Sequence, residues 1–171
     1  MGPHKEITVK NSFSVFYGFV LVATASAAVA LGAAAASAGE CPAGKTGVDV
    51  RKPGPTASSD VTDTVLSAID VSKTSVPLPG YQLRIRRLVV QPGGIVAWHS
   101  HADRPSNIYI LKGEISEYRS TCSVPITHKA GEVVAEFGAG LQHWWRNNSK
   151  KPCILTSSDL YTEKMKEPHQ M

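Results

Sequence analysis

The sequence has little charge and no concentrated basic segment. Only 19% of its 171 residues are Asp, Glu, Lys or Arg, and the formal net charge at pH 7 is +4. It contains no dense run of lysine and arginine and no arginines interleaved with aromatic residues, the features that neutralise phosphates and stack on bases. Nucleic acid is therefore not expected as a partner.

Cysteine is also scarce, with three residues in the chain, Cys41, Cys122 and Cys153. None of them forms a C-x-x-C pair, which disfavours a cysteine-based metal site. One disulfide with one remaining thiol is the simplest arrangement, and three pairings are open. We favour Cys41–Cys122, because this bridge would join a loose N-terminal segment to a loop between two strands and close a long loop.

Residues 1–38 differ in kind from the rest of the chain. Two lysines precede an uncharged stretch that ends in Ala36-Ser37-Ala38. This is the pattern of a secretory signal peptide with a small-x-small cleavage site before Gly39. We therefore expect export to the periplasm or the extracellular space, where disulfides form. The alternative is an uncleaved anchor, since the stretch is long enough to span a bilayer, and only then is the membrane a partner.

Turn-forming residues divide the rest of the chain into short segments. The sequence has 14 glycines and 11 prolines, and short runs rich in β-branched and aromatic residues lie between them. Such runs at close, regular spacing predict an all-β barrel or jelly roll. The predicted strands are 61–71, 81–91, 95–101, 107–111, 114–119, 125–128, 133–137, 143–146 and 153–160. A short helix is the alternative for residues 61–71.

Three regions are predicted after the leader. Residues 39–63 are rich in Pro, Gly, Ser and Thr and have no hydrophobic period, so we expect an extended arm packed across a barrel. Residues 64–160 form the barrel itself. Residues 161–171 are expected to form a polar C-terminal tail.

The predicted strand 81–91 has a clear alternation of polar and apolar residues. Arg84 and Arg86 alternate with leucine and isoleucine, so we expect an exposed basic face, with anion binding as the alternative. Residues 92–94, Pro-Gly-Gly, predict a turn into the next strand.

Three histidines form the candidate metal site. His99 and His101 are two residues apart in a predicted strand, so their side chains point to the same face. His143 begins a later strand after a glycine turn and can meet them inside a barrel. Neutral imidazoles are common ligands of transition metals, and three of them leave positions open for water, oxygen or substrate.

The residues around these histidines resemble the two sequence motifs of the cupins. The resemblance covers residues 64–160 and implies a cupin-type double-stranded β-helix, which is a jelly-roll barrel. The first motif is matched by Gly93, His99, His101 and Gly113, and the second by Gly131, Gly140, His143 and Asn147.

The sequence departs from the family pattern at two positions. Ser106 stands where the family has its glutamate ligand, and Gly138 stands where the second motif has proline. The resemblance therefore implies a three-histidine site without the usual glutamate. Asp103 is a substitute ligand if the strand continues that far, but Pro105 favours a loop position paired with Arg104.

Several other residues are candidates for the surroundings of the metal. Glu114 and Glu117 lie on a predicted strand and are either near the site or solvated. Trp145 shares a face with His143 by alternation. An arginine that holds a substrate carboxylate is a further possibility, with solvent exposure as the alternative. The candidates for supporting or pocket positions are Asp103, Ser106, Tyr109, His128 and Trp145, and the candidate arginines are Arg104, Arg119 and Arg146.

The resemblance implies a mononuclear divalent metal ion, with Fe(II) favoured and Mn, Ni or Zn also compatible. With iron, we expect a dioxygenase-type oxidoreductase acting on a small anionic or chelating substrate. The alternative is a non-catalytic cupin that binds or senses a small ligand, because a missing ligand is typical of cupins that have lost their chemistry. Oxalate oxidation and sugar-phosphate isomerisation are disfavoured, since the cupin sites for them keep the carboxylate. By analogy with the fold, a homodimer is expected.

Overall fold

The computed structural model describes residues 39–165, so the predicted leader 1–38 and the end of the tail lie outside the described residues. Two short 3-10 helices, η1 (Val71–Lys73) and η2 (Glu163–Met165), are the helices of this range. Neither described helix has the length or the apolar character to span a membrane.

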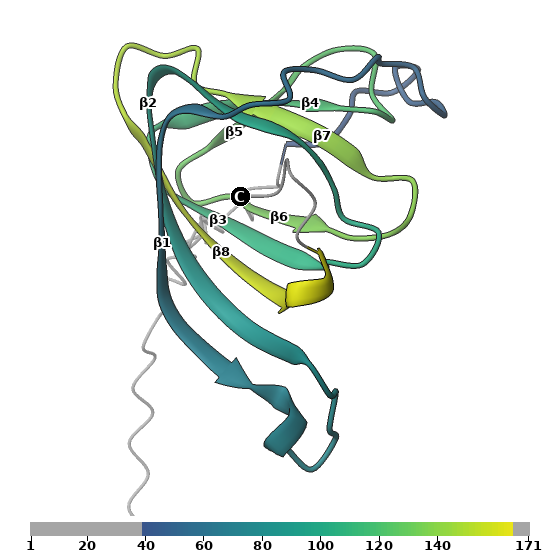
Figure 1. Ribbon diagram of the computed structural model, residues 1–171. Coiled ribbons are helices and arrows are strands. Elements are labelled where there is room, and N and C mark those ends of the chain that lie inside the picture. Colours follow the sequence, from purple (N-terminus) through teal and green to yellow (C-terminus); the bar gives the residue numbers. More distant parts are fainter. Residues whose placement is uncertain (1–38, 166–171) are drawn as a thin grey trace, which may run out of the picture. The chain divides into compact units, whose positions relative to one another are not determined.

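Eight antiparallel strands make up the fold, and they confirm the all-β prediction. The strands join one sheet in the order β5-β4-β7-β2-β8-β3-β6, with β1 paired to β2. The sheet curls so that β4, β5 and β7 lie across from β3, β6 and β8 (Figure 1), which is the double-stranded β-helix of the cupins. The strands are β1 (Ser59–Asp70), β2 (Tyr81–Ser100), β3 (Ser106–Lys112), β4 (Glu114–Arg119), β5 (Ile126–Lys129), β6 (Val133–Glu136), β7 (Gln142–Arg146) and β8 (Cys153–Thr162).

The long strand β2 corrects the predicted turn at residues 92–94. Before this point Val90 pairs with Cys153 of β8, and after it Ile95 pairs with Arg146 of β7. Gly93 adopts a φ of +82°, a conformation that glycine reaches without steric cost. The Pro-Gly-Gly segment therefore bends a continuous strand where it changes partner, instead of ending it.

Alternating residues of β3 and β4 point into the barrel, where they form the hydrophobic core. On β3, Ile108 and Ile110 are buried while Tyr109 between them is exposed. On β4, Ile115 and Glu117 are buried, and so is Ser116 between them. The core cluster consists of Leu88, Val90, Ile108, Ile110, Ile115, Val134, Trp145, Cys153 and Leu155.

The N-terminal half of β2 is oriented opposite to the prediction, because Arg84 and Arg86 point inward. Arg86 is only 6% exposed, and Arg84 is partly buried. Arg84 donates from Nε and Nη2 to the Asp159 carboxylate at 3.0 and 2.8 Å, and Arg86 pairs with Asp63. The acidic residues of β1 and β8 compensate the buried charges, so an exposed basic face was the wrong expectation.

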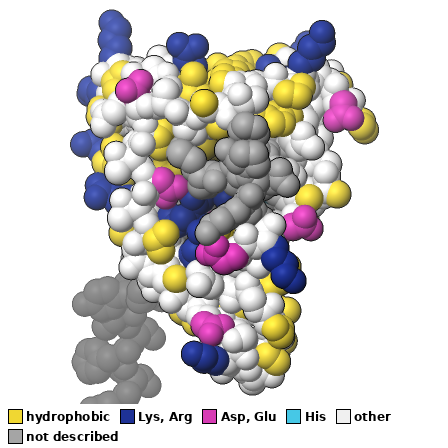
Figure 2. Space-filling model, in the orientation of Figure 1, with side chains coloured by type: hydrophobic (Ala, Val, Ile, Leu, Met, Phe, Trp, Pro, Cys, Tyr) yellow, Lys and Arg dark blue, Asp and Glu magenta, His cyan; other side chains and the backbone are white. Residues whose placement is uncertain are grey.

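Aliphatic side chains instead occupy the outer face of the β1–β2 hairpin. Hydrophobic side chains gather on the surface at the lower end of the view in Figure 2, over the ends of these two strands. The exposed residues there are Val65, Leu66, Ile69, Leu83 and Ile85.

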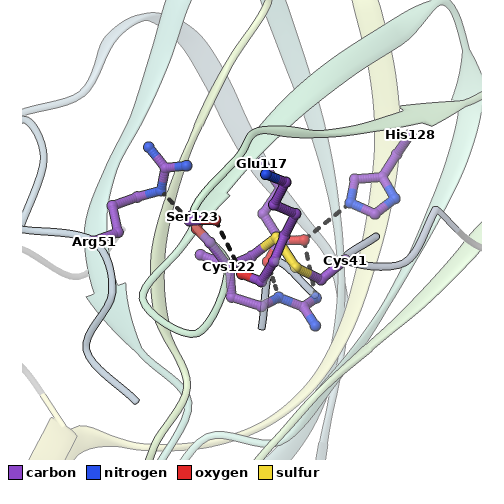
Figure 3. Close-up of a disulfide and its surroundings, with 8 residues drawn as sticks. Cys41, Arg51, Glu117, Cys122, Ser123 and His128 are labelled. Carbon is purple, nitrogen blue, oxygen red and sulfur yellow. Dashed lines mark hydrogen bonds and ion pairs between the residues drawn. A yellow bond between two sulfur atoms is a disulfide. The ribbon is translucent and has the colours of Figure 1, made fainter. Parts of the chain in front are cut away.

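A disulfide between Cys41 and Cys122 attaches the N-terminal arm to the loop after β4, the pairing favoured from sequence. The arm also forms backbone hydrogen bonds there, including one of 3.0 Å from Gly47 N to Thr121 O. Figure 3 shows Glu117 and His128 among the residues that surround the bridge. The arm is thus held against the strands that support the candidate metal site.

Removing this disulfide is expected to destabilise the protein by about 2–5 kcal/mol, because the bridge closes a long loop of the unfolded chain. The two bridged residues are 81 positions apart in sequence. The test compares urea unfolding of the wild type with that of a Cys41→Ser, Cys122→Ser variant. Reduction of the wild type should produce the same loss, whereas the variant should not respond to reductant. Equal stability of the oxidised and reduced wild type would contradict the expectation.

Candidate metal centre

The three predicted histidines come together inside the sheet. His99 near the end of β2 is the register partner of His143 on β7, and His101 follows directly after β2. Their ring centroids lie 4.6 to 4.9 Å apart in all three pairs. The ligand atoms that they offer lie within 4.8 Å of one another, which makes this a candidate metal site.

Each ring is held in one orientation by an acceptor at Nδ1. The Nδ1 atoms of His99 and His101 lie 2.8 Å from backbone carbonyl oxygens two and three residues away. The Nδ1 atom of His143 contacts the Glu117 carboxylate. Because a carbonyl or a carboxylate can only accept, all three Nδ1 atoms carry the proton. The three Nε2 atoms therefore have free lone pairs, as metal ligands require.

The convergence of these lone pairs fits a bound cation. The Nε2 atoms of His99 and His143 lie 3.1 Å apart, although neither carries a proton to share. The Nε2 atom of His101 is buried without a hydrogen-bond partner among the described residues. A divalent ion bound by all three nitrogens would remove the repulsion between the two lone pairs and would give His101 Nε2 a partner.

A fourth donor, Glu136 of β6, was missed from sequence. Its Oε2 atom lies 3.1 Å from His101 Nε2, and its Oε1 atom lies 3.5 Å from His143 Nε2 and makes no hydrogen bond. Ser106 donates from Oγ to Oε2 at 2.9 Å and is the register partner of Glu136. The site thus contains a carboxylate, supplied from the strand that faces the family's glutamate position.

The signal for Glu136 was the alternation of β6. Val134 and Glu136 are both buried, and the residues between and before them are exposed. In a strand that buries one face, a glutamate in phase with a core valine must also point inward. The charge then needs a partner inside the barrel, and the histidines are there.

Glu117 of β4 supports the site from behind His143. It is fully buried, and its carboxylate accepts hydrogen bonds from His128 Nε2 at 2.9 Å and from two Arg119 nitrogens at 2.8 and 2.9 Å. Burial alone would raise the pKa of Glu117, but His143, His128 and Arg119 hold it well below its usual range. Such a carboxylate orients a histidine ligand and increases its basicity.

Burial keeps His99 and His101 neutral. It lowers the pKa of His101 to about 3, with the nearby His143 adding to the effect. The pKa of His99 lies well below its usual range for the same two reasons. Burial raises the pKa of Glu136 instead. Neutral imidazoles and an acceptor carboxylate are the protonation states that bind a metal.

These pKa shifts predict that the metal-free protein loses stability as the pH falls. Between pH 6.5 and the folded-state pKa, the unfolded chain takes up protons at His99 and His101 that the folded chain does not. The loss begins below about pH 6.5 and reaches about 2 kcal/mol per histidine at pH 5. Because the raised pKa of Glu136 opposes this trend, Glu136→Gln should steepen it. Urea unfolding of metal-free protein from pH 7.5 to 5 measures both slopes; a flat profile in the variant would contradict the expectation.

The other predicted site residues divide into two groups. Trp145 is buried, lines the cavity beside the histidines and stacks on His128 with ring centroids 5.0 Å apart. His128 is fully buried. Tyr109 is 43% exposed on the outer face of β3, and Asp103 is exposed on the loop after His101. Neither of these two reaches the cavity. Asp103 lies before β3, which begins at Ser106, and Tyr109 points to the face of β3 opposite to Ile108 and Ile110.

The candidate arginines have three different positions. Arg104 is 3% exposed and lines the cavity, whereas Arg119 is bound to Glu117 and Arg146 is exposed. Arg86 of β2 lines the same cavity. Burial lowers the pKa of Arg104, and the nearby positive charge of Arg86 adds to this effect. Figure 2 shows basic side chains recessed below the surrounding surface on the face drawn.

The cavity that joins these groups is small. Its volume is about 30 Å³. Its polar lining comes from Ser58, Asp63, Arg86, His99, His101, Arg104, Glu136 and Ser157, and its apolar lining from Leu88, Val96, Ala97, Ile108, Trp145 and Leu155. Its contents are thus limited to a metal ion and a ligand of a few atoms.

The fold is a curled antiparallel barrel with three histidines gathered inside it. Residues 86–159 match the family model described as a cupin domain. This part of the chain is therefore a cupin domain. No curated protein matches it.

Solved structures similar to the chain have low sequence identity to it. One is an uncharacterized conserved protein with a double-stranded β-helix domain from Klebsiella pneumoniae (17% identity, 67% of this chain, 84% of that chain, TM-score 0.47). Another is the cupin domain of Cnp3 from Schizosaccharomyces pombe (14% identity, 63% of this chain, 68% of that chain, TM-score 0.46). A third is the Cupin_2 domain of an XRE family transcriptional regulator from Enterobacter cloacae (16% identity, 61% of this chain, 100% of that chain, TM-score 0.45).

Proposed function

We propose that the protein is a metal-dependent cupin oxidoreductase that holds one divalent ion, with Fe(II) favoured, through His99, His101, His143 and Glu136. The observation that carries this proposal is the state of the four donors. Three Nε2 lone pairs and a carboxylate face one another, and His101 Nε2 and Glu136 Oε1 are buried without a hydrogen-bond partner among the described residues. A set of three nitrogens and one oxygen suits Fe(II) and is compatible with Mn, Ni or Zn.

When bound, such an ion supplies Lewis acidity and, in the case of iron, the ability to activate oxygen. The chain's own residues have other tasks. Glu117 orients the His143 ring, and Ser106 holds the Glu136 carboxylate by its hydrogen bond. Trp145 and the aliphatic side chains provide the apolar lining of the cavity.

We propose a small anion as the substrate. Arg104 lines the cavity that contains the metal donors, beside Arg86, which is paired with Asp63. Guanidinium groups bind carboxylates well. The cavity volume of about 30 Å³ favours a ligand of a few heavy atoms. With Glu136 as a carboxylate ligand, the reason for disfavouring small-acid oxidation no longer applies.

Metal analysis of untagged protein tests the proposal. One equivalent of a transition metal is expected in the wild type and well below 0.1 equivalent in His99→Ala and Glu136→Gln, with Asp103→Asn as a matched control that keeps the metal. Oxygen consumption is then measured with small carboxylic acids, thiols and diketones. Arg104→Gln should weaken binding of the acids, whereas Arg87→Gln, at an exposed position, should not. Wild-type protein without metal would refute the proposal.

The second candidate function is a non-catalytic cupin that binds or senses a small ligand. The enclosure of the site favours it, since His143 is fully buried and Glu136 is 1% exposed. This reading predicts metal and anion binding without oxygen consumption or any change in the anion. The same experiment therefore distinguishes the two functions.

We also propose that the protein is exported and acts in an oxidising compartment. The Cys41–Cys122 bridge supports this proposal, because such bridges persist outside the cytosol. The leader pattern of residues 1–38 supports it from sequence.

A further inference from the structure

Gly39, the residue that follows the predicted cleavage site, is seated against β5. Its backbone nitrogen donates a hydrogen bond of 3.1 Å to Oε2 of Glu132. A Cβ atom at this position would lie 2.6 Å from the carbonyl oxygen of Thr127 and 3.3 Å from His128 Nδ1. A signal peptidase reads the small residues before the bond, so cleavage does not require glycine at 39. The requirement for glycine comes from the folded barrel.

Glu132 links this nitrogen to a buried histidine. The Glu132 carboxylate is 14% exposed, and its Oε2 atom lies 3.6 Å from Nδ1 of His128. That Nδ1 atom is buried and makes no hydrogen bond among residues 39–165. The surroundings of Gly39 N thus contain one carboxylate and one unsatisfied ring nitrogen, both suited to a group with several N–H donors.

The same histidine leads to the metal site. His128 contacts Glu117 through Nε2, and Glu117 contacts Nδ1 of His143. A chain of alternating acidic and basic groups therefore runs from Gly39 N to a metal ligand. The Cys41–Cys122 bridge, two residues after Gly39, holds the Gly39 end of this chain of groups in place. Figure 3 shows Cys41 together with Glu117 and His128.

We propose that hydrolysis of the Ala38–Gly39 peptide bond creates an α-ammonium group that forms an ion pair with Glu132 and completes this chain to His143. In the hydrolysis, water adds across the bond, so that Ala38 leaves with a carboxylate and Gly39 keeps an amine that is protonated at neutral pH. The protease is of the signal peptidase class. The proposal rests on the export proposed above and not on the identity of the metal.

Processing then changes the charge at the outer end of the chain. An amide offers one N–H donor and no charge, whereas an ammonium group offers three donors and a positive charge. Glu132 gains an ionic partner, and the neighbouring His128 gains access to a donor. Because partners behind a metal-bound histidine tune its basicity, maturation should strengthen metal binding as well as the fold.

The test begins with the full chain expressed in an exporting host. Intact mass and N-terminal sequencing of the exported protein should give Gly39 as the first residue. The α-amine of this protein should react with an amine-selective reagent at pH 7 about tenfold more slowly than in Glu132→Gln, because the ion pair raises the pKa of the amine by about one unit. Glu40, the exposed residue next to Gly39, provides the control: the α-amine of Glu40→Gln should react at the wild-type rate.

In a protein that begins at Ala38, the α-ammonium group is one residue further from Glu132, and Glu132 itself is unchanged. Its melting temperature should fall by a few degrees. Its affinity for Zn(II) should fall about tenfold. Combining this extension with Glu132→Gln should add little to either loss. A different N-terminus, equal labelling rates or fully additive losses would overturn the proposal. If no variant binds zinc, the labelling and melting results still decide it, and only the metal proposal fails.

Discussion

Moving the carboxylate of the metal site from β6 to β3 is expected to preserve metal binding. Glu136→Ser alone should lower the affinity for Fe(II) or Zn(II) by more than about 100-fold, since it removes a direct donor. Adding Ser106→Glu should restore most of this loss. Ser106 and Glu136 are directly opposed in the β3–β6 pair, and their side chains already touch.

The physical reason is the geometry of antiparallel strands. Side chains of directly opposed residues leave the sheet on the same face with Cβ atoms about 5 Å apart. A glutamate from either strand can therefore reach the same histidines, and the exchanged serine can again donate to it. The double exchange leaves the composition and the charge of the site unchanged.

Metal titrations of the wild type, the two single variants and the double variant measure the coupling between the positions. Glu114→Ser, at an exposed position on β4, serves as the control for loss of a carboxylate elsewhere. The variants must first show wild-type far-UV circular dichroism. If Glu136→Ser binds metal as tightly as the wild type, Glu136 is not a donor. If the double variant is as weak as Glu136→Ser, the two positions are not interchangeable.

Glu117→Gln is expected to have the largest effect on stability of any single substitution in the site. The carboxylate is fully buried and accepts from three residues, His128, His143 and Arg119. Glutamine has one acceptor oxygen, and its amide group would face a donor. Removing one partner from a buried ionic network costs about 3–5 kcal/mol. The His143 ring also loses its anchor, so metal affinity should fall about 10- to 100-fold.

Urea unfolding of metal-free protein isolates the first effect, and metal titration measures the second. Glu114→Gln on the same strand is the matched control, because its side chain is exposed. A loss of stability below about 1 kcal/mol would show that the network does not stabilise the fold. Unchanged metal affinity would show that Glu117 does not position His143.

Much of the site follows from local patterns. The H-x-H spacing requires His99 and His101 to emerge near each other, and the glycine spacings that frame them are those of the cupin motifs. The alternation of β7 puts Trp145 on the side of His143, as predicted. These features depend on residues that are neighbours in sequence, so the period of the strand is enough to predict them.

The direction of charged residues could not be predicted in the same way. The expectation that Arg86 would be exposed followed from its charge, and it was wrong because Asp63 and Asp159 lie beside it in the folded chain. Glu117 and Glu136 were in phase with core residues on their strands, but their burial is favourable only because the histidines of other strands meet them there.

The sequence by itself determined the all-β class, most of the strand positions, the three histidines and the cysteines available for bridging. Only the tertiary structure decided that Glu136 supplies the carboxylate that Ser106 lacks, and that Gly39 lies at the outer end of a chain leading to His143. The reason is that a strand's own period determines which residues share a face. Which faces then meet across the barrel depends on the register and curl of the whole sheet.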